Sequence, residues 1–329
     1  MSGSGPAGSR PSPFRTETRA EGCGRYCPSV LDPREAIDRI NAVYGSHAGH
    51  RALHAHGSFY TGTFTATSEA GRLCRAAPFS GDPVPVLVRW SNAGGDPDRP
   101  DRVPDVRGMS VKLQAPGGDI DLVAQTQPRL PVRTPEDFLG LISASRRRWA
   151  LPLWLARHRS ALPALREGAR VHALGTPYSY AEVTYYPIHA YGWLDERGHR
   201  TWVRYQLVPL AARTDRPEEE LDGPHRLGDE MAARLALGPV AYDLLVKKAG
   251  AGDDPHDPMS VWRSGDAANA GRLEITAPVD DPEQTGGPVV FDPTRVVDGI
   301  ELSDDPILRY RPVAYSESVA RRTSRPDEA

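Results

Sequence analysis

The chain has 329 residues, of which 39% are hydrophobic, and a formal net charge of -3 at pH 7. This length can bury a full core, and the near balance of charge gives no reason to expect a nucleic acid or an acidic membrane as a partner. The 32 prolines and 31 glycines favour a fold with many turns and loops over a helical bundle.

The three cysteines do not describe a disulfide framework, because Cys23 and Cys27 lie four residues apart and Cys74 is alone. A metal site at the first two would lack further ligands nearby, so an exposed, redox-labile pair is the simpler interpretation. The sequence has no apolar run long enough to span a membrane, and its first residues lack the apolar stretch of a secretory signal. We therefore expect a cytoplasmic protein.

The ordered part of the chain is expected to start with a helix. Residues 1–28 are predicted to form a disordered tail, because they contain few apolar residues and show no periodicity. Asp32 can cap a helix that has a proline at its first position. Apolar residues then recur at helical spacing up to Tyr44, and Gly45 ends the helix shortly before His54.

A group of short strands follows this helix. The residues between position 57 and position 125 are rich in β-branched, aromatic and alternating apolar side chains. Loops rich in glycine, aspartate and proline separate them. The expected strands cover residues 59–67, 84–90, 106–113 and 119–125.

A helical section is expected next. It begins at Thr134, a residue that can cap a helix, and continues through an apolar and basic stretch from Trp149 to Leu165. The Arg146–Arg148 run is interpreted as a solvated turn, with an anion or substrate entrance as the alternative.

A second group of strands completes the predicted elements. Strands are expected over residues 180–186, 190–193, 201–208, 240–248 and 272–276, with a helix over residues 218–237. Two separate groups of strands with helices between them predict an α+β fold, an antiparallel barrel with helical insertions.

The main chemical pattern lies near the end of the sequence. Arg311 and Tyr315 stand four residues apart, so on a helix the guanidinium would lie beside the phenol. A neighbouring cation favours the ionised phenol, and a tyrosinate is the haem ligand of catalase. Arg-x-x-x-Tyr alone is a weak motif, because many helices carry it as a solvated pair.

Further motifs strengthen this interpretation. Together with Arg311-Pro-Val-Ala-Tyr315, the segment Arg51-Ala-Leu-His54-Ala-His-Gly57 resembles the haem catalase family, in particular the small, catalase-related peroxidase type without the extra C-terminal domain of large catalases. Other segments match in family order, from about Asn41 to Arg322. They are Thr61-Gly-Thr-Phe-Thr-Ala-Thr67, Val88-Arg-Trp-Ser91, Asp105-Val-Arg-Gly108, Asp119-Ile-Asp-Leu-Val123, Thr134-Pro-Glu-Asp-Phe138 and Gly299-Ile-Glu-Leu-Ser-Asp-Asp-Pro306.

The resemblance implies a fold and a cofactor. The fold is an eight-stranded antiparallel barrel, with haem held between the barrel wall and the N-terminal and C-terminal arms. The cofactor is ferric haem b, bound in a single domain over residues 29–329. Tyr315 is the expected iron ligand and Arg311 is expected to hold it ionised. The expected partners of the haem propionates are Arg51, Arg89 and Arg322, whose guanidinium groups match carboxylates.

The resemblance also implies catalytic residues on the opposite side of the haem. His54 is the expected base that moves a proton between the two peroxide oxygens, a task suited to its pKa near neutrality. Ser91 is expected to hydrogen-bond the far nitrogen of His54. His56 stands where the family more often has lysine, and we interpret it as a residue that supports the site or the structure.

Three departures from the family pattern alter the expected activity. Gln125-Thr126-Gln127 stands where the family has two asparagines, so Thr126 takes the place of an amide that helps hold peroxide. The paired phenylalanines of large catalases are replaced around Arg129–Val132, and Ala320 replaces an arginine. These changes imply slow disproportionation of hydrogen peroxide.

We therefore expect a haem-dependent peroxidase that uses hydrogen peroxide or an organic hydroperoxide to oxidise a small organic donor, with weak or no catalase activity. Two alternatives stay open. One is a biosynthetic haem enzyme, either a hydroperoxide-rearranging enzyme of the allene oxide synthase kind or a tailoring oxidase. The other is a non-catalytic haem sensor or store. No nucleic acid or membrane is expected as a partner, and a homo-oligomer is left open.

Overall fold

The computed structural model describes residues 31–147, 149–211, 221–263 and 265–324. The tail predicted over residues 1–28, with its two cysteines, lies outside these described residues. Among the helices of the described part, none is both long enough and apolar enough to cross a bilayer.

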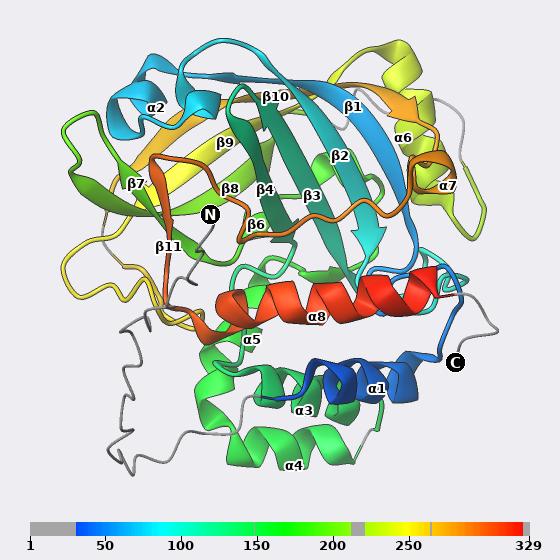
Figure 1. The fold of residues 1–329 in the computed structure, drawn as a ribbon. Coiled ribbons are helices and arrows are strands. Elements are labelled where there is room, and N and C mark those ends of the chain that lie inside the picture. Colours follow the sequence, from blue (N-terminus) through cyan, green and yellow to red (C-terminus); the bar gives the residue numbers. More distant parts are fainter. Residues whose placement is uncertain (1–30, 148, 212–220, 264, 325–329) are drawn as a thin grey trace, which may run out of the picture. The chain divides into compact units, whose positions relative to one another are not determined.

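A curled antiparallel sheet forms the framework of the described chain (Figure 1). Its strands follow the order β11-β7-β8-β9-β10-β1-β2-β3-β4-β6, and β5 pairs with β3. The bounds of the strands are β1 Gly57–Ala66, β2 Val84–Asn92, β3 Asp105–Ala115, β4 Gly118–Gln125, β5 Leu174–Gly175, β6 Tyr186–Pro187, β7 Ala190–Leu194, β8 Arg200–Pro209, β9 Val240–Lys248, β10 Ala267–Val279 and β11 Ile300–Leu302.

The two predicted groups of strands join into this one sheet because β1 pairs with both β2 and β10. Eleven strands are present in the described sheet, where the sequence patterns predict nine and the family resemblance implies a barrel of eight. The three strands β5, β6 and β11 have only two or three residues, too few to leave an alternating pattern. Next to β6, Tyr185 exchanges backbone hydrogen bonds of 3.0 and 2.8 Å with Leu207 of β8, so the sheet curls back towards itself.

One predicted strand is wrong. Residues 180–186 were expected to be extended, but Tyr180–Glu182 forms a 3-10 turn, and of that segment Tyr186 belongs to β6 and Tyr185 makes an isolated bridge to β8. Ser179 caps the turn by accepting a hydrogen bond from the amide of Ala181. Tyr180 in the turn and Tyr185 after it are both buried, and burial alone gives the same aromatic pattern that a strand would give.

Large aromatic side chains fill the interior of the sheet. Trp90 and Trp193 are both 0% exposed. Tyr180 stacks against Trp90 with ring centroids 6.0 Å apart, and Nε1 of Trp193 donates a 2.8 Å hydrogen bond to the hydroxyl of Tyr205. Burial of one large apolar side chain contributes roughly 1.5–3 kcal/mol, so this core fixes the strands from which part of the site projects.

Several helices lie along one side of the sheet, with α8 nearest to it and α1, α3 and α4 beyond (Figure 1). Leu31, Ala36, Ile37, Ile40 and Leu139 form a second small core between α1 and α3. The helices are α1 Pro33–Tyr44, α2 Ser68–Leu73, α3 Pro135–Ser145, α4 Ala150–Arg157, α5 Leu162–Arg170, α6 Arg226–Leu237, α7 Glu283–Gly286 and α8 Pro306–Thr323.

The predicted helix caps are confirmed. The side chain of Asp32 accepts a 2.9 Å hydrogen bond from the amide of Arg34, and Gly45 ends α1 with a φ of 92°. Thr134 caps α3 by accepting from the amide of Asp137 at 3.1 Å. The predicted helix over residues 218–237 begins later, at Arg226, and part of the predicted range lies outside the described residues.

Candidate active site

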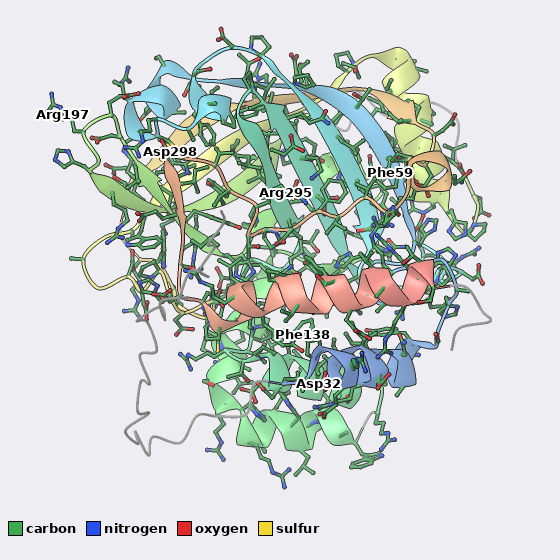
Figure 2. The ribbon with its side chains drawn as sticks, in the orientation of Figure 1. Asp32, Phe59, Phe138, Arg197, Arg295 and Asp298 are labelled. Atoms are coloured by element: carbon green, nitrogen blue, oxygen red, sulfur yellow. The ribbon has the colours of Figure 1, made fainter. Side chains whose placement is uncertain are left out.

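A largely apolar cavity lies between α8 and the wall formed by β2, β3 and β4. Residues of α1 and α3 close another side, including Phe138, which Figure 2 shows beneath α8. Seven of the eight predicted site residues line this cavity, although the sequence separates the first from the last by about 270 positions. They are Arg51, His54, Arg89, Ser91, Arg311, Tyr315 and Arg322.

His54 lies in the segment before β1 and has an unusual backbone conformation, with a φ of 56°. Its amide donates a 3.1 Å hydrogen bond to the carbonyl of Ala93, and its Nδ1 lies 2.9 Å from the hydroxyl of Ser91 on β2. Gly108 on β3 makes this approach possible, because a Cβ there would lie 2.7 Å from both the His54 ring and the Ser91 oxygen.

The electrostatic surroundings keep His54 neutral. Burial, followed by the positive charges of Arg89, Arg311 and Arg51, lowers the pKa of its imidazole to about 3. Both causes disfavour the protonated ring. A neutral imidazole can accept a proton from a molecule in the cavity.

Tyr315 projects from α8 together with Arg311. Nη1 of Arg311 donates a 2.7 Å hydrogen bond to the phenol oxygen, which confirms the helical i, i+4 arrangement predicted from the sequence. Burial alone would lower the pKa of Arg311, but attraction to the Tyr315 oxygen and the hydrogen bond to it raise that pKa above its usual value. A permanent cation therefore lies against the phenol oxygen.

A buried pair, His189 and Asp305, also lies near Arg311, and the sequence does not predict it. Nδ1 of His189 lies 2.6 Å from Oδ2 of Asp305, and both side chains are 1% exposed. Asp305 also caps α8 by accepting from the amides of Ile307 and Leu308. Burial and the cation of Arg311 lower the pKa of His189, and His189 Nε2 and Arg311 Nε are both buried with no hydrogen-bond partner. This pair anchors the start of the helix that carries Tyr315. The Asp-Pro step before α8 could have indicated the cap, whereas nothing in the sequence near His189 indicates its partner.

A cluster of arginines lies at one end of the cavity. Arg51 and Arg322 both pair with the carboxylate of Glu283, at 2.7 and 3.0 Å. Arg89 donates to the carbonyl oxygens of His54 and Ala55, and burial lowers its pKa to about 9. Three guanidinium groups therefore lie near two carboxylates, those of Glu283 and Asp281, and the excess of positive charge favours further negative charge at this end.

Thr126 is the one predicted residue that does not line the cavity. Its hydroxyl donates a 2.7 Å hydrogen bond to the carbonyl of Ala173 and accepts one from the amide of Arg107. Gln125 lines the cavity instead, and it is paired across the sheet with Gly108, the glycine against which His54 packs.

Arg129 also points elsewhere, since its guanidinium binds Glu167 and donates to the carbonyl of Met259. Leu130 is the residue of that segment that lines the cavity. Arg129 therefore adds no polar group to the cavity.

Comparisons with known proteins agree with this geometry. The family model described as Catalase matches residues 8–222. Two solved structures share the fold, a fungal catalase and catalase A from Saccharomyces cerevisiae. Each has a TM-score of 0.73 and 20% identity, and the matches cover 94% and 95% of this chain and 67% and 69% of those chains, respectively. The chain belongs to the catalase family.

Within this family the chain is of the small, catalase-related peroxidase type. A "Catalase-related peroxidase" of Mycolicibacterium paratuberculosis is 45% identical, and the match covers 89% of this chain and 95% of that protein. Another protein of that name, from Synechococcus elongatus, is 29% identical, with 91% of each chain covered. The resemblance inferred from the sequence motifs is thus confirmed.

Proposed function

We propose that this protein is a haem-dependent peroxidase. It uses hydrogen peroxide or an organic hydroperoxide to oxidise a small organic donor, and it has weak or no catalase activity. The observation that carries the proposal is the meeting, in one cavity, of a neutral His54 and the Arg311–Tyr315 pair. The names of the two catalase-related peroxidases support it and do not favour a rearranging enzyme or a haem store.

The cavity residues fit ferric haem b. The donor set combines a phenol oxygen beside a fixed cation, apolar walls for a porphyrin ring, and an arginine cluster for its propionates. Tyr315 would bind the iron, and Arg51, Arg89 and Arg322 would bind the propionates. When bound, ferric haem would store the oxidising equivalents of the peroxide until the organic donor takes them up.

His54 is proposed to move the proton of the peroxide. For its Nε2 to accept that proton, Nδ1 must carry hydrogen and donate it to the oxygen of Ser91, 2.9 Å away. The imidazole then takes a proton from one peroxide oxygen and delivers it to the other as the bond between the two oxygens breaks, so that the second oxygen leaves as water, or as an alcohol from an organic hydroperoxide. The first oxygen and both oxidising equivalents would be accepted by the haem when it is bound. Ser91 holds the ring in the tautomer and orientation that this transfer needs.

Gln125 is proposed in place of Thr126 as the residue that orients peroxide. The Thr126 hydroxyl already has a donor and an acceptor among backbone groups. The amide of Gln125 can both donate and accept a hydrogen bond, as a peroxide ligand requires. Since Gln125 is one methylene longer than asparagine, the peroxide site is expected to differ from that of a family member with asparagine.

The remaining parts of the proposal concern the whole chain. Residues 29–329 are proposed to form one domain, in which the eight longer strands β1–β4 and β7–β10 form the barrel and the segments before β1 and after β11 are the arms that embrace the haem. A cytoplasmic location and a homo-oligomer are also proposed. Fractionation of cells and light scattering of the purified protein test these two points.

The proposed activity is tested by supplying peroxide with and without an organic donor. The haem-loaded protein is expected to oxidise a phenolic dye rapidly and to release little oxygen from hydrogen peroxide alone. Rapid oxygen release would make the protein a true catalase. Consumption of a lipid hydroperoxide without dye oxidation would support the rearranging enzyme instead.

A further inference from the structure

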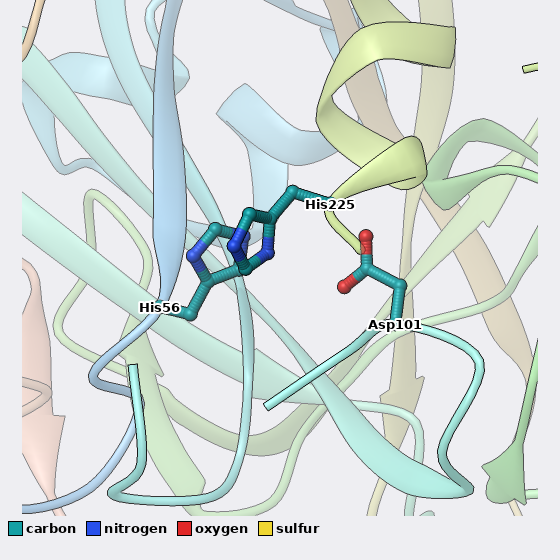
Figure 3. Close-up of side chains that lie close together, drawn as sticks. All are labelled: His56, Asp101 and His225. Atoms are coloured by element: carbon teal, nitrogen blue, oxygen red, sulfur yellow. The ribbon is translucent and has the colours of Figure 1, made fainter. Parts of the chain in front are cut away.

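Apart from the cavity, one cluster among the described side chains has the composition of a metal site. His56, Asp101 and His225 converge from three segments, namely the end of the segment before β1, the loop between β2 and β3, and the residue before α6 (Figure 3). One ligand atom from each lies within 4.8 Å of the others. None of the three is among the residues that line the cavity.

Hydrogen bonds fix Asp101 beside the two histidines (Figure 3). It is 0% exposed, its Oδ1 accepts a 2.7 Å hydrogen bond from Asn92, and its Oδ2 accepts a 2.9 Å hydrogen bond from the amide of Leu227. Its own amide donates to the carbonyl of Pro224. These bonds hold the carboxylate against the start of α6, where His225 lies. The nearby Arg107 binds the main-chain carbonyl of Asp101 and not its carboxylate.

The two imidazoles lie side by side. Their rings stack with centroids 4.0 Å apart and an interplanar angle of 24°. Nδ1 of His225 is buried and has no hydrogen-bond partner. A buried ring nitrogen with a free lone pair or proton costs free energy unless something binds it.

We propose that His56, Asp101 and His225 bind a divalent transition-metal ion of the zinc type. Two imidazoles and one carboxylate are ordinary zinc ligands, and a site with three protein ligands leaves a fourth position for water. With metal–ligand distances of about 2.0–2.2 Å, tetrahedral ligand atoms lie about 3.3 Å apart. To reach this geometry, the stacked imidazoles must turn so that one nitrogen of each points at the ion, and the ligand atoms, now within 4.8 Å of one another, must move closer together.

The bound ion would connect parts of the protein that support the active site. His56 is two residues from His54 and directly precedes β1, whereas His225 precedes α6. A metal that joins them fixes the segment in which His54 has its left-handed backbone conformation. Since the ion binds the folded chain in preference to the unfolded chain, it raises the melting temperature.

Equilibrium dialysis against Zn²⁺, followed by elemental analysis, tests this proposal on the full-length protein. Cys23→Ser and Cys27→Ser remove the alternative thiol ligands of the N-terminal segment. We expect one zinc ion per chain in this background, and a decrease in affinity of at least about 100-fold in His56→Gln and in His225→Gln. His199→Gln is the matched control, because His199 is exposed and distant in sequence, and it should keep the affinity of its parent.

No tightly bound zinc, or unchanged affinity in the His56→Gln and His225→Gln variants, would overturn the proposal. X-ray absorption at the zinc edge gives a second readout that does not depend on how the variants fold. The expected spectrum of the zinc-loaded parent shows two imidazoles and further oxygen ligands. A shell of oxygen ligands without imidazole would exclude this site.

Discussion

The two sides of the cavity are built in different ways. On the Tyr315 side, the phenol and its cation belong to one helix, four residues apart, and a 2.7 Å hydrogen bond joins them. On the His54 side, the base depends on a serine from β2 and a glycine from β3. The first arrangement is local and the second requires the assembled sheet.

The electrostatics of the two sides differ in the same way. Burial opposes the charged form of both Arg311 and His54. Arg311 has a phenol oxygen as partner, so its pKa is raised in spite of burial. His54 has arginines as its charged neighbours, and they add to the effect of burial, so that its pKa falls to about 3. One buried cavity therefore holds a permanent cation on one side and a neutral base on the other.

The largest effect is expected from removal of the base. His54→Ala should lower the rate of peroxide-dependent dye oxidation at least ~10²-fold, the typical share of an acid-base group. Haem content should not change, because the proposed iron ligand is on the other side. His50→Ala, at an exposed histidine in the same segment, is the control. A His54→Ala enzyme with full activity would show that the His54 side performs no proton transfer.

A smaller effect is expected at Gly108. In Gly108→Ala, the new Cβ would lie 2.7 Å from the His54 ring and the Ser91 oxygen, so the imidazole must shift. We expect a decrease in turnover of about tenfold, with unchanged haem binding, because small displacements of catalytic groups are costly. Gly238→Ala is the control, since a Cβ there meets no atom within 4 Å. Equal activity of the two variants would mean that this close packing is not needed for catalysis.

Loss of the Ser91 hydroxyl should have a milder effect. One hydrogen bond contributes about 1 kcal/mol, so Ser91→Ala is expected to lower turnover roughly fivefold. Ser110→Ala removes another cavity-lining hydroxyl of the sheet and serves as control. A loss in Ser110→Ala as large as in Ser91→Ala would argue against a specific role for the Ser91–His54 bond.

The smallest change in activity is expected from pH. Since the pKa of His54 is about 3 in the folded protein, the base should not titrate between pH 5 and pH 8, and activity should not fall there for this reason. Because the unfolded chain binds a proton at this residue below pH 6.5 and the folded chain does not, stability should decrease as pH falls from 6.5 towards 3. Denaturant unfolding at pH 7 and pH 5 measures this decrease, which should be smaller in His54→Asn. An equal decrease in both proteins would contradict a depressed pKa.

The sequence predicts the local features of this molecule well. The caps of α1 and α3, the strands of the sheet and the Arg311–Tyr315 pair all follow from residues within a few positions of one another. Long-range partners could not be predicted in this way. His189 and Asp305 meet across 116 positions, and Glu283 joins Arg51 and Arg322 from a short helix that carries no motif.

Thr126 and Gln125 show why the sequence alone cannot tell which residue of a strand faces the cavity. Neighbouring residues of a strand point to opposite faces of the sheet, so a shift of one position selects a side chain on the face away from the cavity. Only the register of β3 with β4 shows that Gln125 faces the site. The resemblance to the family located the segment but not the side chain.

The phenol oxygen of Tyr315 is proposed to bind the haem iron, and the proposed function depends on this bond. The most direct measurement is titration of haem into the full-length protein, the Tyr315→Phe variant and the Tyr310→Phe control, followed by absorption spectroscopy. Tyr310 lies on the same helix and lines the same cavity, but its hydroxyl has no hydrogen-bond partner. We expect Tyr315→Phe to change the spectrum of the ferric haem and to weaken binding at least about tenfold, whereas Tyr310→Phe should resemble the parent. An unchanged spectrum and affinity in Tyr315→Phe would contradict the account.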